Sequence, residues 1–157
     1  MVIKSNKRDF KANKLKIGTR GSPLALAQAL EVKKEIIKHH KLNDQSVEII
    51  SISTKGDRVT DRPLTEIGGK GLFTEEIENK LFHNEIDIAV HSMKDMPTEF
   101  PTGLGINTFL KREDFRDSFV SLRYNSINEL PLGAVVGSSS IRRKAQLLSI
   151  RSDLKVV

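Results

Sequence analysis

The sequence of 157 residues contains no cysteine and no tryptophan, and it has a single tyrosine. Without cysteine the chain cannot form a disulfide, a thiolate metal site or a cysteine nucleophile. The four histidines show neither an HExxH motif nor another paired metal spacing, so we expect no metal. Few aromatic platforms are available for stacking bases, and no RNP, zinc-finger or basic-zipper pattern occurs. Nucleic acid is therefore not the expected partner.

Long apolar runs are also missing. None approaches the roughly 18 residues that span a bilayer, so we expect no membrane partner. Residues 1–14 are basic and polar and lack the apolar segment of a secretory signal, which indicates a flexible leader on a cytoplasmic protein. The 38% hydrophobic and 29% charged content is typical of a globular domain. The net charge of +6 favours an acidic partner, such as a small polycarboxylate or phosphate.

Strand and helix patterns alternate along the first part of the sequence. β-branched runs predict strands, and apolar residues at helical spacing predict helices. Ser22 and Pro23 suit the N-cap and the first turn of the first helix. The predicted order is a strand at 15–20, a helix at 24–40, a strand at 47–53, a helix at 74–84 and a strand at 88–90. This order predicts an α/β layer with parallel pairing.

The other segments receive simpler predictions. Residues 54–63 read as a polar loop, and the glycine-rich stretch 67–73 reads as a turn. A strand is predicted at 106–114 and a short helix near 126–130. The chain then continues with a strand at 134–136, a helix capped by a serine and the first residues of another strand near 153–157.

Charged and hydroxyl residues follow three of the predicted strands. In open α/β sheets, ligands bind beyond the carboxyl ends of the strands. Arg20 and Ser22 follow the first strand, and Lys94 and Asp95 follow the strand that contains Ile88. The third set lies at the start of a predicted helix. The N-terminus of a helix favours an anion, and arginine guanidiniums in its first turn can bind a carboxylate in bidentate fashion. It consists of Ser138, Ser139, Ser140, Arg142 and Arg143.

Each of these sets has a plainer alternative. The serines can cap a helix whose arginines are solvated, and Lys94 with Asp95 can form a solvated turn. "GGKGLF" at 68–73 is not a phosphate-binding P-loop, because a Walker motif needs Ser or Thr after its lysine and a longer spacing. Taken alone, that stretch predicts only a tight turn.

Five stretches together resemble the porphobilinogen deaminase (hydroxymethylbilane synthase) family. They occur in the order and at the spacing of that family, and the resemblance runs from about Leu15 to the last residue. The stretches are "IGTRGSPLALAQ" (17–28), "GGKGLF" (68–73), "DIAVHSMKDMP" (87–97), "KREDFRDSFVS" (111–121) and "GSSSIRRKAQL" (137–147).

The resemblance implies a transferase that joins four porphobilinogen units head to tail with release of ammonia. Asp95 would be the catalytic acid, and Lys70 and Phe73 would contact the substrate from a flexible loop over the cleft. Porphobilinogen would be the small-molecule substrate of a monomeric enzyme of haem and tetrapyrrole biosynthesis. The residues expected to bind substrate or cofactor carboxylates are Arg20, Ser22, Lys94, Ser138, Ser139, Ser140, Arg142 and Arg143.

The resemblance also implies three domains, of which the first two are lobes of the periplasmic-binding-protein type. We expect domain 1 at 15–110, and a hinge with the truncated start of domain 2 at 111–157. Family members carry a dipyrromethane cofactor on a cysteine of the third domain. That domain is absent from this chain, so we expect no covalent cofactor and an inactive fragment. A non-catalytic anion-binding lobe of periplasmic-binding type is the alternative, although an acid such as Asp95 would repel an anionic ligand.

Overall fold

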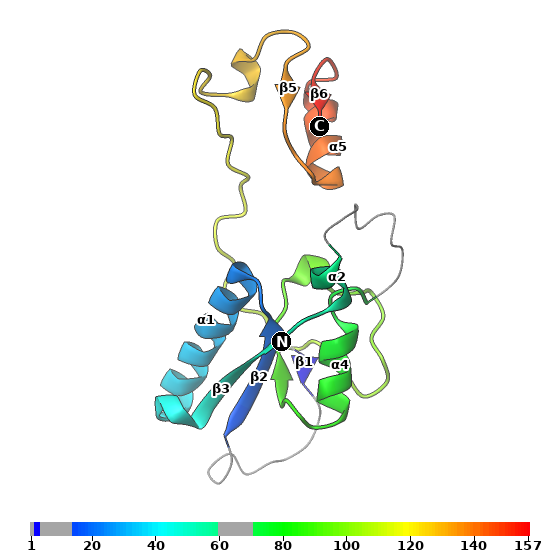
Figure 1. Cartoon of the computed structure of the whole chain (residues 1–157). Helices are drawn as coiled ribbons and strands as arrows, with labels where there is room; N and C mark the ends of the chain where they lie inside the picture. The colour runs from blue at the N-terminus through cyan, green and yellow to red at the C-terminus, as the bar shows by residue number, and fades with distance from the viewer. Residues whose placement is uncertain (1, 4–13, 60–70) are drawn as a thin grey trace. The chain divides into compact units, whose positions relative to one another are not determined.

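The computed structural model describes residues 2–3, 14–59 and 71–157, and the chain divides into two compact units. The first unit is Met1–Lys111 and the second is Arg112–Val157. Figure 1 shows a mixed α/β arrangement in each of them. Within the described residues, no helix is both long enough and apolar enough to cross a membrane.

A four-stranded sheet forms the centre of the first unit, in the order β1-β4-β2-β3. Strand β2 (Leu15–Arg20) lies between β3 (Val47–Ile52) and β4 (Ile88–Ala89) and is parallel to both. Strand β1 (Val2–Ile3) pairs with β4 in the antiparallel direction. The leader predicted at 1–14 did not include this strand. The predicted α/β layer with parallel pairing is confirmed.

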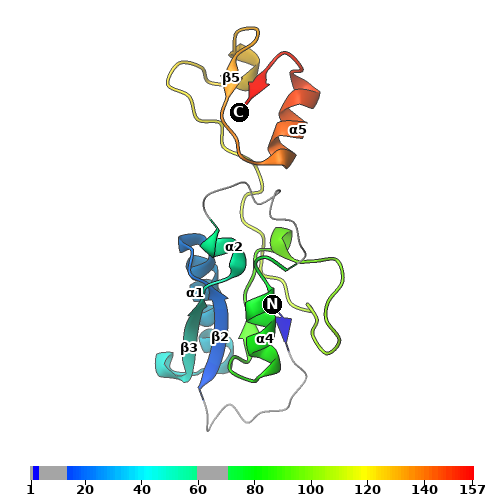
Figure 2. The same ribbon diagram turned by 45° about the vertical axis from the view of Figure 1, so that its right-hand side comes forward.

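Helices cover both faces of the sheet, as Figures 1 and 2 show. Helix α1 (Pro23–His40) begins where the sequence predicts, because the Ser22 hydroxyl accepts a hydrogen bond from the Ala25 N–H at 3.3 Å. Helix α4 (Glu75–Phe82) has three acids in its first turn, where the helix dipole favours negative charge.

The strands divide their side chains between two cores because successive residues point to opposite faces. On the α1 face, Ile17 and Val47 pack against Ala29 and Val32. On the α4 face, Ile52 and Ala89 pack with three further buried residues, namely Ile77, Leu81 and Ile86. Gly18 faces this second core, where an added Cβ would lie 2.3 Å from Ile86 Cδ1.

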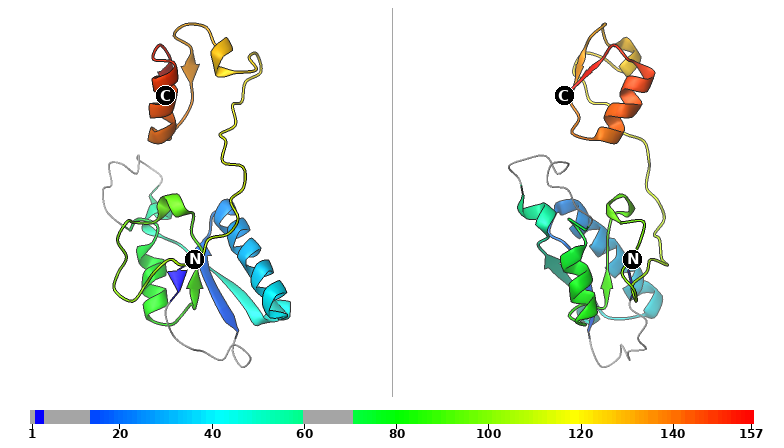
Figure 3. Two further views of the ribbon diagram at one scale, coloured as in Figure 1. Left: turned by 180° about the vertical axis from the view of Figure 1, so that it is seen from behind. Right: turned by 90° about the vertical axis from the view of Figure 1, so that its right-hand side faces the viewer.

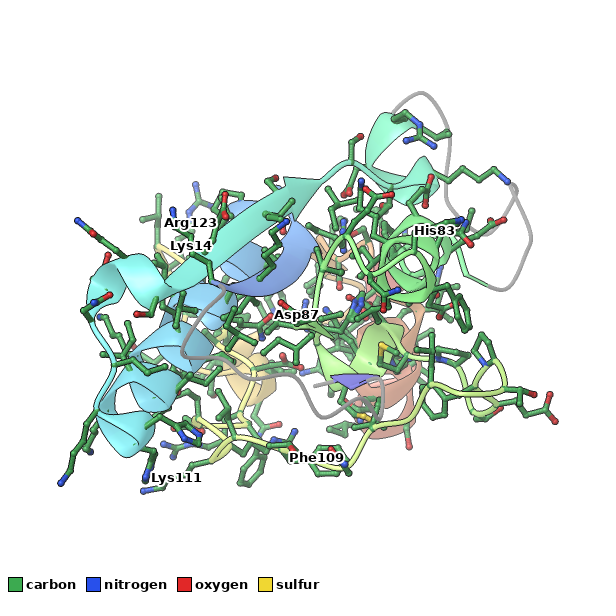
Figure 4. All side chains as sticks on the ribbon, turned by 90° about the horizontal axis from the view of Figure 1, so that it is seen from below. Lys14, His83, Asp87, Phe109, Lys111 and Arg123 are labelled. Atoms are coloured by element: carbon green, nitrogen blue, oxygen red, sulfur yellow. The ribbon has the colours of Figure 1, made fainter. Side chains whose placement is uncertain are left out.

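Two segments differ from their predictions. Residues 54–63 were expected to be a loop, but Lys55–Arg58 form the short helix α2. Thr54 and Asp57 close a capping box there, which supplies the local hydrogen bonds that the loop prediction overlooked. The strand predicted at 106–114 was wrong. Among the described residues, Ile106 forms a single bridge and residues 107–114 are not part of a strand. The side chains of Phe109 and Lys111 are exposed, as Figure 4 shows.

The second unit contains a two-stranded parallel sheet, shown in Figure 3. Strand β5 (Val135–Val136) and strand β6 (Lys155–Val156) are joined by helix α5 (Ile141–Ile150). A short 3₁₀ helix, Ile127–Glu129, precedes them near the position predicted for a helix. The side chain of Arg151, at the end of α5, donates hydrogen bonds to the carbonyls of Ile127 and Leu130, both at 3.2 Å. These bonds connect the end of α5 to the 3₁₀ helix.

The packing of Ile77 leads to a stability prediction. Ile77 is fully buried between α4 and the sheet, so Ile77→Ala should lower the free energy of unfolding by about 2–5 kcal/mol. Leu30→Ala, on the exposed side of α1, should change it by no more than about 0.5 kcal/mol. Urea unfolding followed by far-UV circular dichroism measures both values. Equal effects of the two substitutions would contradict the described core.

Candidate functional site

A pocket of about 270 Å³ opens at the carboxyl ends of the parallel strands in the first unit. Five of the predicted site residues line it, contributed by β2, by the start of α1, by the segment before α4 and by the turn after β4. These residues are Arg20, Ser22, Phe73, Lys94 and Asp95. Parallel strands place their carboxyl ends at one edge of the sheet, which explains why residues far apart in sequence meet here.

Arg20 lies between two carboxylates. Its Nε donates to both carboxylate oxygens of Asp57, at 3.0 and 3.3 Å, and its Nη2 donates to Asp57 Oδ1. Its Nη1 lies 3.7 Å from Oδ2 of Asp95, too far for a hydrogen bond but within ion-pair distance. The guanidinium therefore makes a two-donor contact with Asp57 and leaves its other edge toward Asp95.

The pKa of Asp57 reflects this contact. Burial raises the pKa of the carboxyl, but hydrogen bonds from Arg20 and Thr54 outweigh that effect and hold the pKa below its ordinary value. Asp57 therefore remains ionised near neutral pH and balances the charge of Arg20.

Phe73 and Gly56 complete the environment of Arg20. The guanidinium carbon of Arg20 lies 3.9 Å from the centroid of the Phe73 ring, a cation–π distance. The ring packs so closely on Gly56 that an added Cβ would lie 2.2 Å from one of its atoms. Lys70, the other predicted contact residue of this stretch, lies outside the described residues.

Lys94 and Asp95 belong to a 3₁₀ turn, Met93–Asp95, that follows β4. Lys94 is exposed, whereas Asp95 is half-buried. Ser92, just before the turn, donates a hydrogen bond to Gln28 Oε1 at 3.0 Å and so connects the end of β4 to α1. The pocket thus presents two cations and one carboxylate, a set that can bind an anionic group while stabilising a positive charge.

The remaining predicted residues lie in the second unit, at the start of α5. The Ser140 hydroxyl accepts from the Arg143 N–H at 3.3 Å, so it caps the helix, as the plainer alternative proposed. The Ser138 hydroxyl accepts from the Ser140 N–H at 3.3 Å, while Ser139 is exposed. Arg143 pairs with Asp117, with Nη2 at 2.8 Å from its Oδ1, and Arg142 is exposed.

Several pocket residues were missing from the predicted site. Gln28, His91 and Ser92 line the pocket, and Asp57 holds Arg20. The capping pattern of Thr54 and Asp57 directly after a strand was the available signal for Asp57. Among the described residues, no group of three or more His, Asp or Glu side chains is arranged to hold a metal ion.

His91, which also lines the pocket, has a strongly lowered pKa. Burial lowers its pKa to about 4, and the positive charge of Arg20 contributes in the same direction. The imidazole is therefore neutral at physiological pH and can donate one hydrogen bond and accept another.

The low pKa of His91 predicts a pH-dependent stability. Between pH 6.5 and about 4 the unfolded chain binds a proton at His91 that the folded chain does not, so stability falls as the pH falls through this range. His91→Gln should remove up to about 1.4 kcal/mol per pH unit of that dependence. Urea unfolding of both proteins across the range measures the difference. Parallel pH curves for the two proteins would contradict the assignment.

Comparisons with known proteins identify the family of this chain. The family model described as "Porphobilinogen deaminase, dipyromethane cofactor binding domain" matches residues 15–157. The chain is 61% identical over 145 residues to the porphobilinogen deaminase of Paracoccus denitrificans (strain Pd 1222), an alignment that covers 92% of this chain. It spans 46% of the length of that relative. This chain therefore belongs to the porphobilinogen deaminase family.

Proposed function

We propose that this chain is the amino-terminal part of a porphobilinogen deaminase, a transferase that condenses four porphobilinogen units into hydroxymethylbilane. The observation that carries the proposal is the pocket in which Arg20 and Lys94 lie with Asp95 at the carboxyl ends of β2 and β4. Porphobilinogen has two carboxylates and a pyrrole N–H, so its binding calls for cations and its reaction calls for an acid.

Asp95 is the proposed catalytic residue. In each condensation the aminomethyl C–N bond of porphobilinogen breaks, a C–C bond forms to the free ring carbon of the chain end, and that carbon loses its proton. The nitrogen of the broken bond leaves as ammonia. Positive charge develops on the pyrrole during these changes, and a half-buried carboxylate can stabilise it and carry the proton. Arg20 and Lys94 would hold the substrate carboxylates.

The dipyrromethane cofactor, when bound, supplies the free ring carbon to which the first substrate unit is joined. Its carboxylates call for cations, and the pocket of the first unit offers Arg20 and Lys94. In the second unit, Arg142 and Arg143 would bind carboxylates in the same way. This chain contains no cysteine, so the thioether that attaches the cofactor would require a residue outside it.

We also propose that the two units correspond to periplasmic-binding-type lobes, with the second represented by its beginning. The division of the chain after Lys111 supports this assignment. The parallel strands of each unit support it as well.

Asp95→Asn tests the catalytic role in the intact protein, meaning this chain with whatever follows residue 157 in its reading frame. Ammonia release from porphobilinogen should fall at least about 100-fold, because the amide cannot carry the proton. Far-UV circular dichroism should be unchanged. Asp44→Asn is the matched control, since Asp44 is an exposed acid paired with Lys33 at 3.0 Å. Near-normal turnover in Asp95→Asn would remove Asp95 from the mechanism. Binding of porphobilinogen without turnover by the intact wild-type protein would favour the non-catalytic anion-binding alternative.

The arginines of α5 lead to a separate test. Arg142→Leu or Arg143→Leu should weaken carboxylate binding by about 1.5–3 kcal/mol, the usual contribution of a hydrogen bond to a charged group. Lysine at either position should restore binding only in part, because the bidentate fork is lost. The measurements are the Michaelis constant for porphobilinogen and cofactor loading by intact mass. Normal values for both leucine variants would leave these arginines as part of a solvated helix face.

A further inference from the structure

Asp57 binds one edge of the Arg20 guanidinium, although the proposed reaction assigns no role to Asp57. A guanidinium has five N–H donors in a rigid fork. Asp57 takes the edge formed by Nε and Nη2, and this fixes the direction of the opposite edge, where Nη1 faces Asp95 and the pocket. Side chains of both partners are mostly shielded, at 20% exposed for Arg20 and 22% for Asp57.

Asp57 is itself held in place. Its Oδ2 accepts from the Thr54 hydroxyl at 2.7 Å and from the Thr54 N–H at 3.2 Å, and the Thr54 side chain is fully buried. The neighbouring Gly56 donates its N–H to the Leu72 carbonyl at 2.8 Å. Helix α2 thus anchors the carboxylate that holds Arg20 and contacts the chain segment whose Phe73 ring covers the guanidinium.

Without Asp57, another carboxylate is available to Arg20. Asp95 Oδ2 already lies 3.7 Å from Nη1, and a small rotation of the side chain would allow a bidentate pair. Such a pair would occupy the donors intended for a substrate carboxylate and the carboxylate intended for the pyrrole at the same time.

We propose that Asp57 is a positioning residue, which holds one edge of Arg20 so that the other edge binds a substrate carboxylate and Asp95 remains free to act. This inference rests on the proposed function of Arg20 and Asp95. It assigns to α2 a role in the pocket beyond local capping.

The direction in which removal of the Asp57 charge changes the affinity for porphobilinogen distinguishes a positioning role from a purely electrostatic one. Asp57 is a negative charge beside an anion-binding pocket, so by charge alone its removal should strengthen anion binding. Positioning makes the opposite prediction. Asp57→Asn should weaken binding of porphobilinogen about tenfold or more, because Arg20 turns toward Asp95.

The test begins with the Arg20 side chain, which reports independently of any function. In ¹⁵N-labelled protein, the Nε–Hε resonance of Arg20 should exchange slowly with water and be shifted by the Phe73 ring. Asp57→Asn should move the resonance and speed its exchange. In the double variant Asp57→Asn with Asp95→Asn, the resonance should move again, because the second carboxylate is lost too. An unchanged resonance in Asp57→Asn would overturn the proposal.

Calorimetric titration with porphobilinogen follows on the intact protein, together with turnover. Asp57→Asn should lower affinity and turnover, and Asp57→Glu should restore part of both, which loss of local structure would not allow. Asp44→Asn should behave as wild type. Equal or tighter binding in Asp57→Asn would overturn the positioning role. If that variant does not fold, Asp57→Ser decides the matter, because a serine hydroxyl can still accept from Thr54 but lacks the carboxylate that pairs with Arg20. Unchanged affinity in Asp57→Ser would overturn the positioning role. Failure of the wild-type protein to bind porphobilinogen would instead contradict the proposed function, while the Arg20 resonance would still report on Asp57.

Discussion

The parallel pairing of β2 with both of its neighbours determines the arrangement of the pocket. Ile17 is opposite Ile49 of β3 and Ile88 of β4, so the three strands run in register and end at the same edge. The residues that follow each strand are thereby brought together, although Arg20 and Asp57 are 37 positions apart in the sequence. Burial of the two cores on either side of the sheet supplies the free energy that keeps this register.

At that edge, the guanidinium of Arg20 lies between the carboxylates of Asp57 and Asp95, and it pairs more closely with Asp57. Asp57 accepts hydrogen bonds from Nε and Nη2 of Arg20, whereas Asp95 makes a single contact at 3.7 Å. An arginine that pairs fully with an acid favours the ionised form of that acid, as the lowered pKa of Asp57 shows. With the proposed roles, Asp57 pairs with Arg20 and leaves Asp95 for the chemistry.

The sequence predicted those features that depend on neighbours along the chain. Ser22 and Pro23 located the start of α1, and the apolar run before His91 located β4. The polar residues at the strand ends indicated the pocket through Arg20, Lys94 and Asp95. Features that depend on tertiary contacts were not visible. Nothing near Asp57 reveals that its partner is Arg20. The residues at 106–110 resemble a strand, although only Ile106 forms a bridge among the described residues.

The Phe73 ring has a consequence for how the pocket responds to its solvent. By lying 3.9 Å from the guanidinium carbon, the ring keeps water and mobile ions away from one face of Arg20. The Debye length at physiological ionic strength is about 8 Å, and it applies to charges that are surrounded by electrolyte. A charge covered on one side by an aromatic ring and on another by Asp57 is screened less. Attraction between this pocket and a carboxylate should thus persist at salt concentrations that weaken attraction to the exposed lysines elsewhere on the surface.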